Sequence, residues 1–112
     1  MNENELSDIL KAIAHPVRLR ILRALSGTER NVGEIDEAAN VGQPALSQQL
    51  AVLRKAGVVA TRKDAKLVFY RIEEDRILAV SKDLAALIAG EPREGPSRRR
   101  ATPDAANFAR LG

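Results

Sequence analysis

The chain has 112 residues, of which 45% are hydrophobic and 3% aromatic, with 18 basic and 15 acidic side chains. One small domain of this length buries a limited share of its surface, so dimerisation is a reasonable expectation. The lack of cysteine excludes disulfides, thiolate metal sites and thiol nucleophiles. The longest apolar run, residues 84–89, is too short to span a bilayer, and the polar N-terminal segment is unlike a secretory signal. We therefore expect a cytoplasmic protein.

The first quarter of the chain predicts two helices separated by a proline. The apolar face of the first helix is made by Leu6, Ile9, Leu10 and Ile13. Pro16 opens the second helix, because the first helical position needs no backbone donor, and His15 directly precedes it. The apolar face of the second helix is made by Val17, Ile21, Leu22 and Leu25. Gly27 is expected to end it.

Two further helices follow, joined by a tight turn. Residues 32–39 predict a short helix with Ile35, Ala38 and Ala39 directed inward. Asn40 and Gly42 tolerate a positive φ, which favours a turn at residues 40–42. Gln43 and Pro44 open the next helix, whose buried stripe is Leu46, Leu50 and Leu53. Gly57 is expected to end it.

The apolar period then changes from 3.6 to 2. Residues 58–63 and 66–72 predict a β-hairpin with its tip at residues 63–66. A last helix follows, ending at Gly90, with a heptad-like seam of Ile77, Val80, Leu84 and Leu87. Residues 91–112 hold three of the five prolines and several arginines, which predicts a flexible Arg/Pro-rich tail.

Charge is concentrated in the middle of the chain. Residues 43–72 hold six basic side chains and one acidic side chain, whereas residues 1–42 and 73–90 are both net acidic. A basic segment of this kind is typical of proteins that bind a polyanion. An ordinary basic surface is the alternative explanation when charge is considered alone.

The order of the predicted elements indicates which polyanion the basic segment binds. A short helix, a turn, a second helix and a hairpin form a winged helix-turn-helix, here mainly α with the order α-α-α-α-β-β-α. The recognition helix would be about residues 43–56 and the wing about residues 58–72. The outer face of the predicted recognition helix carries small or amide-bearing residues near its start and basic residues near its end, namely Ser47, Gln48, Ala51 and Lys55.

This surface predicts two kinds of DNA contact. Amide and hydroxyl groups can pair with base edges in the major groove, whereas basic side chains neutralise phosphates without reading sequence. The predicted base-reading residues are Gln43, Ser47 and Gln48. The predicted phosphate-binding residues are Lys55, Arg62, Lys63 and Lys66. Phe69 and Tyr70 are better explained by packing of the hairpin than by base stacking.

Four blocks of the sequence resemble the ArsR/SmtB family of winged-helix repressors: residues 10–22, 42–54, 56–59 and 69–72. The resemblance implies a homodimer built from the first and last helices, which binds an operator palindrome and is released by an inducer. The two apolar seams then predict a dimer interface of Leu6, Leu10, Ile13, Val80, Leu84 and Leu87. Residues 1–90 would form the DNA-binding and dimerisation domain, and residues 91–112 lie outside the resemblance.

The sequence departs from the family where the family senses metals or sulfur. Metal-sensing members often place cysteines in the segment matching residues 30–34, where this chain has Asn31, Val32 and Gly33. The last helix offers Asp75 and Asp83 but no histidine. In a sulfide-responsive and biofilm-related branch, a cysteine pair matches positions near Asn31 and Ala89, and neither is cysteine here. We therefore predict no metal site, no cofactor and no thiol switch.

The chain has a single histidine, His15. His15 is better explained by capping and packing of the second helix than by metal binding. The favoured function is a DNA-binding transcriptional regulator, acting as a repressor. The alternatives are a signalling module that binds an anionic ligand near the dimer interface or Arg98–Arg100, and a protein–protein adaptor. An enzyme is disfavoured, because no nucleophile–base spacing or phosphate-binding glycine loop is present.

Overall fold

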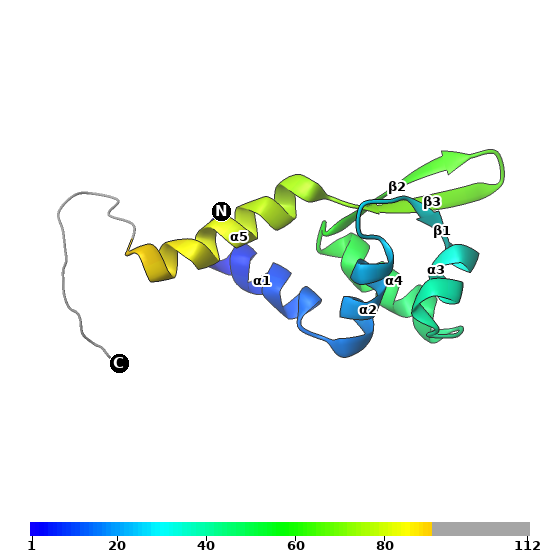
Figure 1. The fold of residues 1–112 in the computed structure, drawn as a ribbon, viewed down its shortest axis with the longest axis horizontal. Coiled ribbons are helices and arrows are strands. Elements are labelled where there is room, and N and C mark those ends of the chain that lie inside the picture. The colour runs from blue at the N-terminus through cyan, green and yellow to red at the C-terminus, as the bar shows by residue number, and fades with distance from the viewer. Residues whose placement is uncertain (91–112) are drawn as a thin grey trace. The chain divides into compact units, whose positions relative to one another are not determined.

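The structure is a computed structural model that describes residues 1–90 (Figure 1). Its elements are α1 (Glu3–Ile13), α2 (Pro16–Ala24), β1 (Arg30–Asn31), α3 (Val32–Ala39), α4 (Ala45–Lys55), β2 (Val59–Asp64), β3 (Leu67–Ile72) and α5 (Glu74–Ala89). The first structural unit is Met1–Val80, and the second begins at Ser81, within α5. The predicted tail lies outside the described residues. None of the helices in residues 1–90 is long and apolar enough to cross a membrane.

Polar side chains begin the first three helices. Asn2 and Asn31 each accept a hydrogen bond from the backbone N–H of the glutamate three residues later, and the carboxylate of that glutamate accepts one from the asparagine N–H. His15 Nδ1 accepts from the Val17 N–H at 3.1 Å, and Pro16 holds the first helical position of α2. The predicted capping role of His15 is therefore confirmed.

The core of the first unit is built from the predicted apolar faces. Leu46, Leu50 and Leu53 of α4 are at most 1% exposed, and Ile21, Leu25 and Ile35 are equally buried. The face predicted for α1 divides: Ile9 is buried, whereas Leu6, Leu10 and Ile13 are half-buried at the edge of the core. Ala38 is exposed, so its predicted inward position is wrong; Ala39 supplies the small buried side chain at this end of α3.

The helix-turn-helix is α3, the turn and α4. Asn40 ends α3 with φ 54°, and Gly42 has φ 86°, as expected for residues that tolerate the left-handed region. Pro44 is the N-cap of α4 rather than its first helical residue, so the helix begins slightly later than predicted. The length of α3 agrees with the prediction, because its N-cap and its Asn terminator are both readable from sequence.

The sheet has three antiparallel strands in the order β1-β3-β2, one more than the predicted hairpin. In β1, Arg30 pairs with Tyr70 and Asn31 pairs with Phe69. Two residues are too few to show an alternating pattern, which is why β1 could not be predicted. The Arg30 Nε also donates to the Ala24 carbonyl oxygen at 2.7 Å, and this bond ties the strand to the end of α2.

Candidate DNA-binding surface

One face of α4 is available to a partner. Ser47, Gln48 and Ala51 are exposed, whereas the leucines on the opposite side of the helix fill the core. Burial of that apolar stripe holds the helix in place, since each buried leucine contributes about 1.5–3 kcal/mol to folding. The predicted base-reading residues Ser47 and Gln48 therefore stand on a rigid element with their side chains in solvent.

A side-chain bridge that the sequence did not reveal fixes α4 against the N-terminal helices. Arg18 Nη1 donates to Gln49 Oε1 at 2.6 Å, and other nitrogens of Arg18 donate to the carbonyl oxygens of Ala12 and Lys11. These two carbonyls belong to the last turn of α1, where helical carbonyls lack internal partners. Arg18 thus connects α1, α2 and the predicted recognition helix.

The turn before α4 is held by a carboxylate and an amide. Asp36 Oδ1 accepts from the backbone N–H groups of Val41 and Gly42 at 3.2 and 2.8 Å. Gln43 Oε1 accepts from the Ser47 N–H at 3.1 Å and so caps the first turn of α4. The Gln43 side chain thus uses its oxygen within the fold.

A hollow of about 430 Å³ separates α4 from β3, and its lining includes Ser47, Ala51, Arg54, Lys55 and Tyr70. Ser47 and Lys55 were predicted to contact DNA, so the structure brings a base-reading candidate and a phosphate-binding candidate to one depression. Arg54 was not among the predicted contacts, although its charge and its place beside Lys55 were visible in the sequence. Tyr70 also packs against the core, in agreement with the packing role expected for it.

The two lysines of the wing lie at different places, Lys63 on one face of β2 and Lys66 at the hairpin tip. In β2, side chains alternate between the two faces of the sheet, so Lys63 lies on the face of Val59 and Thr61, and Arg62 lies on the opposite face. Val59 is buried, and Tyr70, which pairs with Thr61, borders the α4 hollow. The face of Lys63 is therefore the one turned toward α4. Lys66 is exposed at the hairpin tip.

Arg62 differs from the other predicted phosphate contacts. Its Nε lies 2.9 Å from both carboxylate oxygens of Glu29, its Nη2 lies 2.8 Å from Glu29 Oε1, and its Cζ lies 4.8 Å from the centre of the Phe69 ring. The hydrogen bonds from Arg62, opposed by desolvation and helped by the charges of Arg62 and Arg71, lower the pKa of the Glu29 carboxyl. The same bonds raise the pKa of Arg62. The prediction did not foresee that this arginine has a partner within its own chain.

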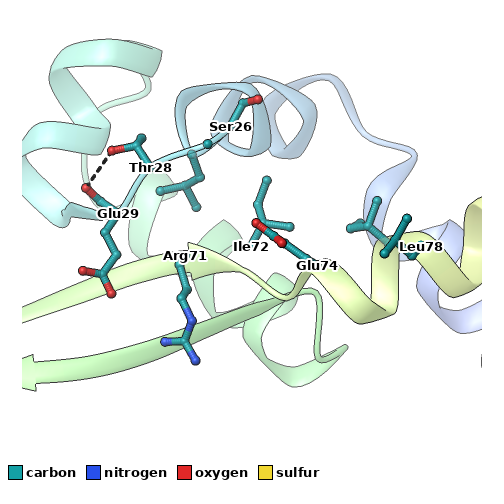
Figure 2. Close-up of a pocket in the computed structure, with 10 residues that line it drawn as sticks. Ser26, Thr28, Glu29, Arg71, Ile72, Glu74 and Leu78 are labelled. Carbon is teal, nitrogen blue, oxygen red and sulfur yellow. Dashed lines mark hydrogen bonds between the residues drawn. The ribbon is translucent and has the colours of Figure 1, made fainter.

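The link between α2 and β1 also borders a cavity of about 540 Å³, whose apolar lining includes Leu25, Ile72, Ile77 and Leu78. Figure 2 shows the Arg71 side chain directed away from Ser26 and Thr28. The Thr28 hydroxyl donates to the Glu29 carbonyl oxygen at 3.4 Å. The lining of the cavity has one basic residue, Arg71, and two acidic ones, Glu29 and Glu74.

Comparison with known proteins identifies the family. Residues 15–61, which include the helix-turn-helix, match the model for bacterial regulatory proteins of the arsR family. The chain is 38% identical over 91 residues to the biofilm growth-associated repressor of Xylella fastidiosa strain 9a5c, covering 81% of this chain and 80% of that protein. The chain belongs to the ArsR family of bacterial regulatory proteins.

Other ArsR-type relatives agree in sequence and in structure. The crystal structure of the transcriptional repressor BigR from Xylella fastidiosa superposes with a TM-score of 0.61 at 42% identity, covering 76% of this chain and 86% of that one. The transcriptional activator HlyU of Vibrio cholerae is 44% identical over 72 residues, which are 64% of this chain and 67% of that protein. The predicted winged-helix fold is confirmed.

The residues predicted for an ArsR-type dimer interface are found in three environments. On α1, Leu6 and Leu10 line a shallow hollow of about 380 Å³, and Ile13 is half-buried. On α5, Leu84 and Leu87 are exposed, and Ile88, which was not predicted, is 92% exposed. Val80 is 5% exposed and belongs to the core of its own chain, so little of it is left for a partner.

For this ArsR-family chain, the part that the structure describes holds no cluster of three or more histidine, cysteine, aspartate or glutamate side chains suited to a metal ion. Asp75 and Asp83 both lie on α5, and Asp75 is in its first turn. His15 is already engaged as the N-cap of α2.

Proposed function

We propose that this chain is a sequence-specific DNA-binding transcriptional repressor that acts in the cytoplasm as a homodimer on an operator palindrome, and that it is not an enzyme. The observation that carries the proposal is the polar, exposed face of α4, held rigid by a fully buried apolar stripe and placed beside a basic wing. The naming of similar proteins as repressors supports the direction of regulation.

Each candidate residue has a distinct role in this proposal. Gln43, Ser47 and Gln48 contact base edges, because amide and hydroxyl groups at the start of a recognition helix can pair with bases in the major groove. Lys55, Lys63 and Lys66 contact phosphates and supply affinity that depends on salt. Arg62 is not included among these contacts, because its guanidinium is paired with Glu29.

The dimer would place two copies of α4 on successive turns of one DNA face. Leu6, Leu10 and Ile13 of α1 and Leu84 and Leu87 of α5 offer apolar surface for a partner. A homodimer requires half-sites related by a two-fold axis, with centres about 34 Å apart or a multiple of that distance.

A pair of variants tests the assignment of roles. Gln48→Ala should weaken binding to the cognate site by about 1–3 kcal/mol and leave binding to random duplex nearly unchanged. Lys63→Ala should weaken both and reduce the slope of log K against log salt by about one unit per subunit. Fluorescence anisotropy with both duplexes over a range of salt concentrations measures these effects. The opposite pattern would show that the base-reading and phosphate-binding roles have been exchanged.

A further inference from the structure

The contact between Glu29 and Arg62 joins two segments that the helix-turn-helix itself does not connect. Glu29 ends the link between α2 and β1, and Arg62 lies 33 positions later in β2. The carboxylate meets the guanidinium through its Nε and Nη2 edge, the paired geometry that arginine favours with carboxylates. The guanidinium of Arg62 stacks over the Phe69 ring, and Asp64 Oδ2 lies 3.7 Å from Arg62 Nη1.

The register of the sheet explains why these groups meet. Arg62 pairs with Phe69, and Phe69 pairs with Asn31, so the three side chains share one face across the strands. Glu29 lies two positions before Asn31 and therefore reaches the same face. This face is opposite to the one that carries Lys63 and turns toward α4.

Stability is a weak explanation for this pair. The side chain of Arg62 is 48% exposed and that of Glu29 is 28% exposed, and exposed ion pairs contribute little to folding. The larger effect of the pair is on the positive charge that the wing can offer to DNA phosphates. Because its Nε and Nη2 donors face Glu29, Arg62 forms a pair with no net charge and does not offer this edge of the guanidinium to a phosphate.

This placement matters because of how non-specific DNA binding works. Affinity for any duplex rises with the number of phosphates that a protein neutralises, whereas discrimination between sequences comes from base contacts. A further free arginine on the wing would strengthen binding to all sequences alike, and so would strengthen binding to the many non-specific sites that compete with one operator.

We propose that Glu29 limits the sequence-independent affinity of this chain for DNA, because it pairs with the Nε and Nη2 donors of Arg62 and so keeps one positive charge of the wing from a phosphate. This inference rests on the proposed DNA-binding function. It leaves Lys63 and Lys66 as the basic side chains of the wing that contact phosphate, and it assigns Phe69 the role of a platform for Arg62.

The test is a double-mutant cycle on random duplex DNA, with the full chain and with folding checked by circular dichroism. A plot of log K against log salt falls as salt rises, and Glu29→Ala should make this fall steeper by about 0.9 per chain, the value for one additional phosphate contact. Arg62→Ala alone should leave the slope unchanged, and the double variant Glu29→Ala/Arg62→Ala should restore the wild-type slope. Asp75→Ala, an exposed change in the first turn of α5, controls for the altered net charge.

The outcomes separate this inference from the DNA-binding function itself. Binding of the wild-type chain to a selected site tests the function on its own. An unchanged slope for Glu29→Ala would overturn the role of Glu29. A shallower slope for Arg62→Ala alone would also overturn it, because Arg62 would then already contact a phosphate in the wild type. Heparin chromatography gives a second readout that needs no DNA: Glu29→Ala should elute at higher salt than Asp75→Ala, and equal elution would overturn the inference.

Discussion

Single side chains set the geometry of the recognition helix before any DNA is bound. Arg18 connects the end of α1 to Gln49, Asp36 closes the turn between α3 and α4, and Gln43 caps the first turn of α4. None of these three is fully buried, and each contacts backbone or amide groups. A polar side chain near a helix-turn-helix can therefore be essential to its shape without contacting DNA.

Asp36 provides a direct test at this scale. Asp36→Ala removes the acceptor for two half-buried N–H groups, those of Val41 and Gly42, and should lower the free energy of unfolding by about 1–3 kcal/mol. Asp36→Asn keeps an oxygen acceptor at the same place and should lose clearly less. Urea denaturation of both variants measures the difference. Equal stability of the alanine variant and the wild type would contradict the role given to Asp36.

Sequence reasoning found the contacts that repeat along an element and missed those that join distant ones. The stripe of Leu46, Leu50 and Leu53 was predictable because a helix repeats every 3.6 residues. The capping by His15 was predictable from its place before Pro16. The Arg18–Gln49 and Glu29–Arg62 contacts join residues 31 and 33 positions apart, and no local pattern encodes such a distance.

At the scale of elements, the wing depends on strands from two parts of the chain. The hairpin β2–β3 was predicted from its alternating pattern, but β1 adds to β3 from the opposite side and places Glu29 near Arg62. This arrangement could not be predicted, because the two-residue strand has no period of its own. The wing is therefore attached to the α2–β1 link as well as to α4.

The attachment of the wing should depend on pH with a definite sign. The pKa of Glu29 is lowered in the folded chain, chiefly by its hydrogen bonds from Arg62, with further attraction from the charge of Arg71. A depressed carboxyl pKa means that the stabilisation is present above the ordinary value of about 4.3 and is lost as the pH falls through the lower folded value. The pair is thus intact at neutral pH.

Nuclear magnetic resonance can follow this titration at one site. The carboxyl carbon of Glu29 should titrate with a midpoint below that of an ordinary glutamate, and Arg62→Ala should move the midpoint upward. Asp64, which also faces Arg62, is recorded in the same spectra as an internal comparison. An identical Glu29 midpoint in the wild type and in Arg62→Ala would contradict the pairing.

For the molecule as a whole, the apolar surface of α5 has a clear consequence. Leu84 and Leu87 are exposed, with Leu87 at 77%, and Ile88 is more exposed still. A small chain with several exposed large hydrophobic side chains on one helix gains stability when a second copy covers them. The proposed homodimer accounts for this surface and for the apolar hollow on α1.

Leu84→Asp tests this assembly. The charge would have to be buried in the proposed interface, so the variant should sediment as a monomer and lose specific DNA binding, because one recognition helix reads only half a palindrome. Lys82→Asp, at an exposed position on the opposite side of the same segment, should remain dimeric. Sedimentation velocity distinguishes the two states. A Leu84→Asp variant that stays dimeric would place the interface elsewhere.

The central claim is that the exposed face of α4 reads a specific DNA sequence within a symmetric dimer. Selection of bound sequences from a pool of random duplexes tests it most directly, with Gln48→Ala taken through the same selection. We predict that the wild type enriches an inverted repeat whose half-sites lie about one helical turn apart, and that Gln48→Ala loses or alters the preference at one base position in each half-site. Failure of the wild type to enrich any sequence over the starting pool would contradict the claim.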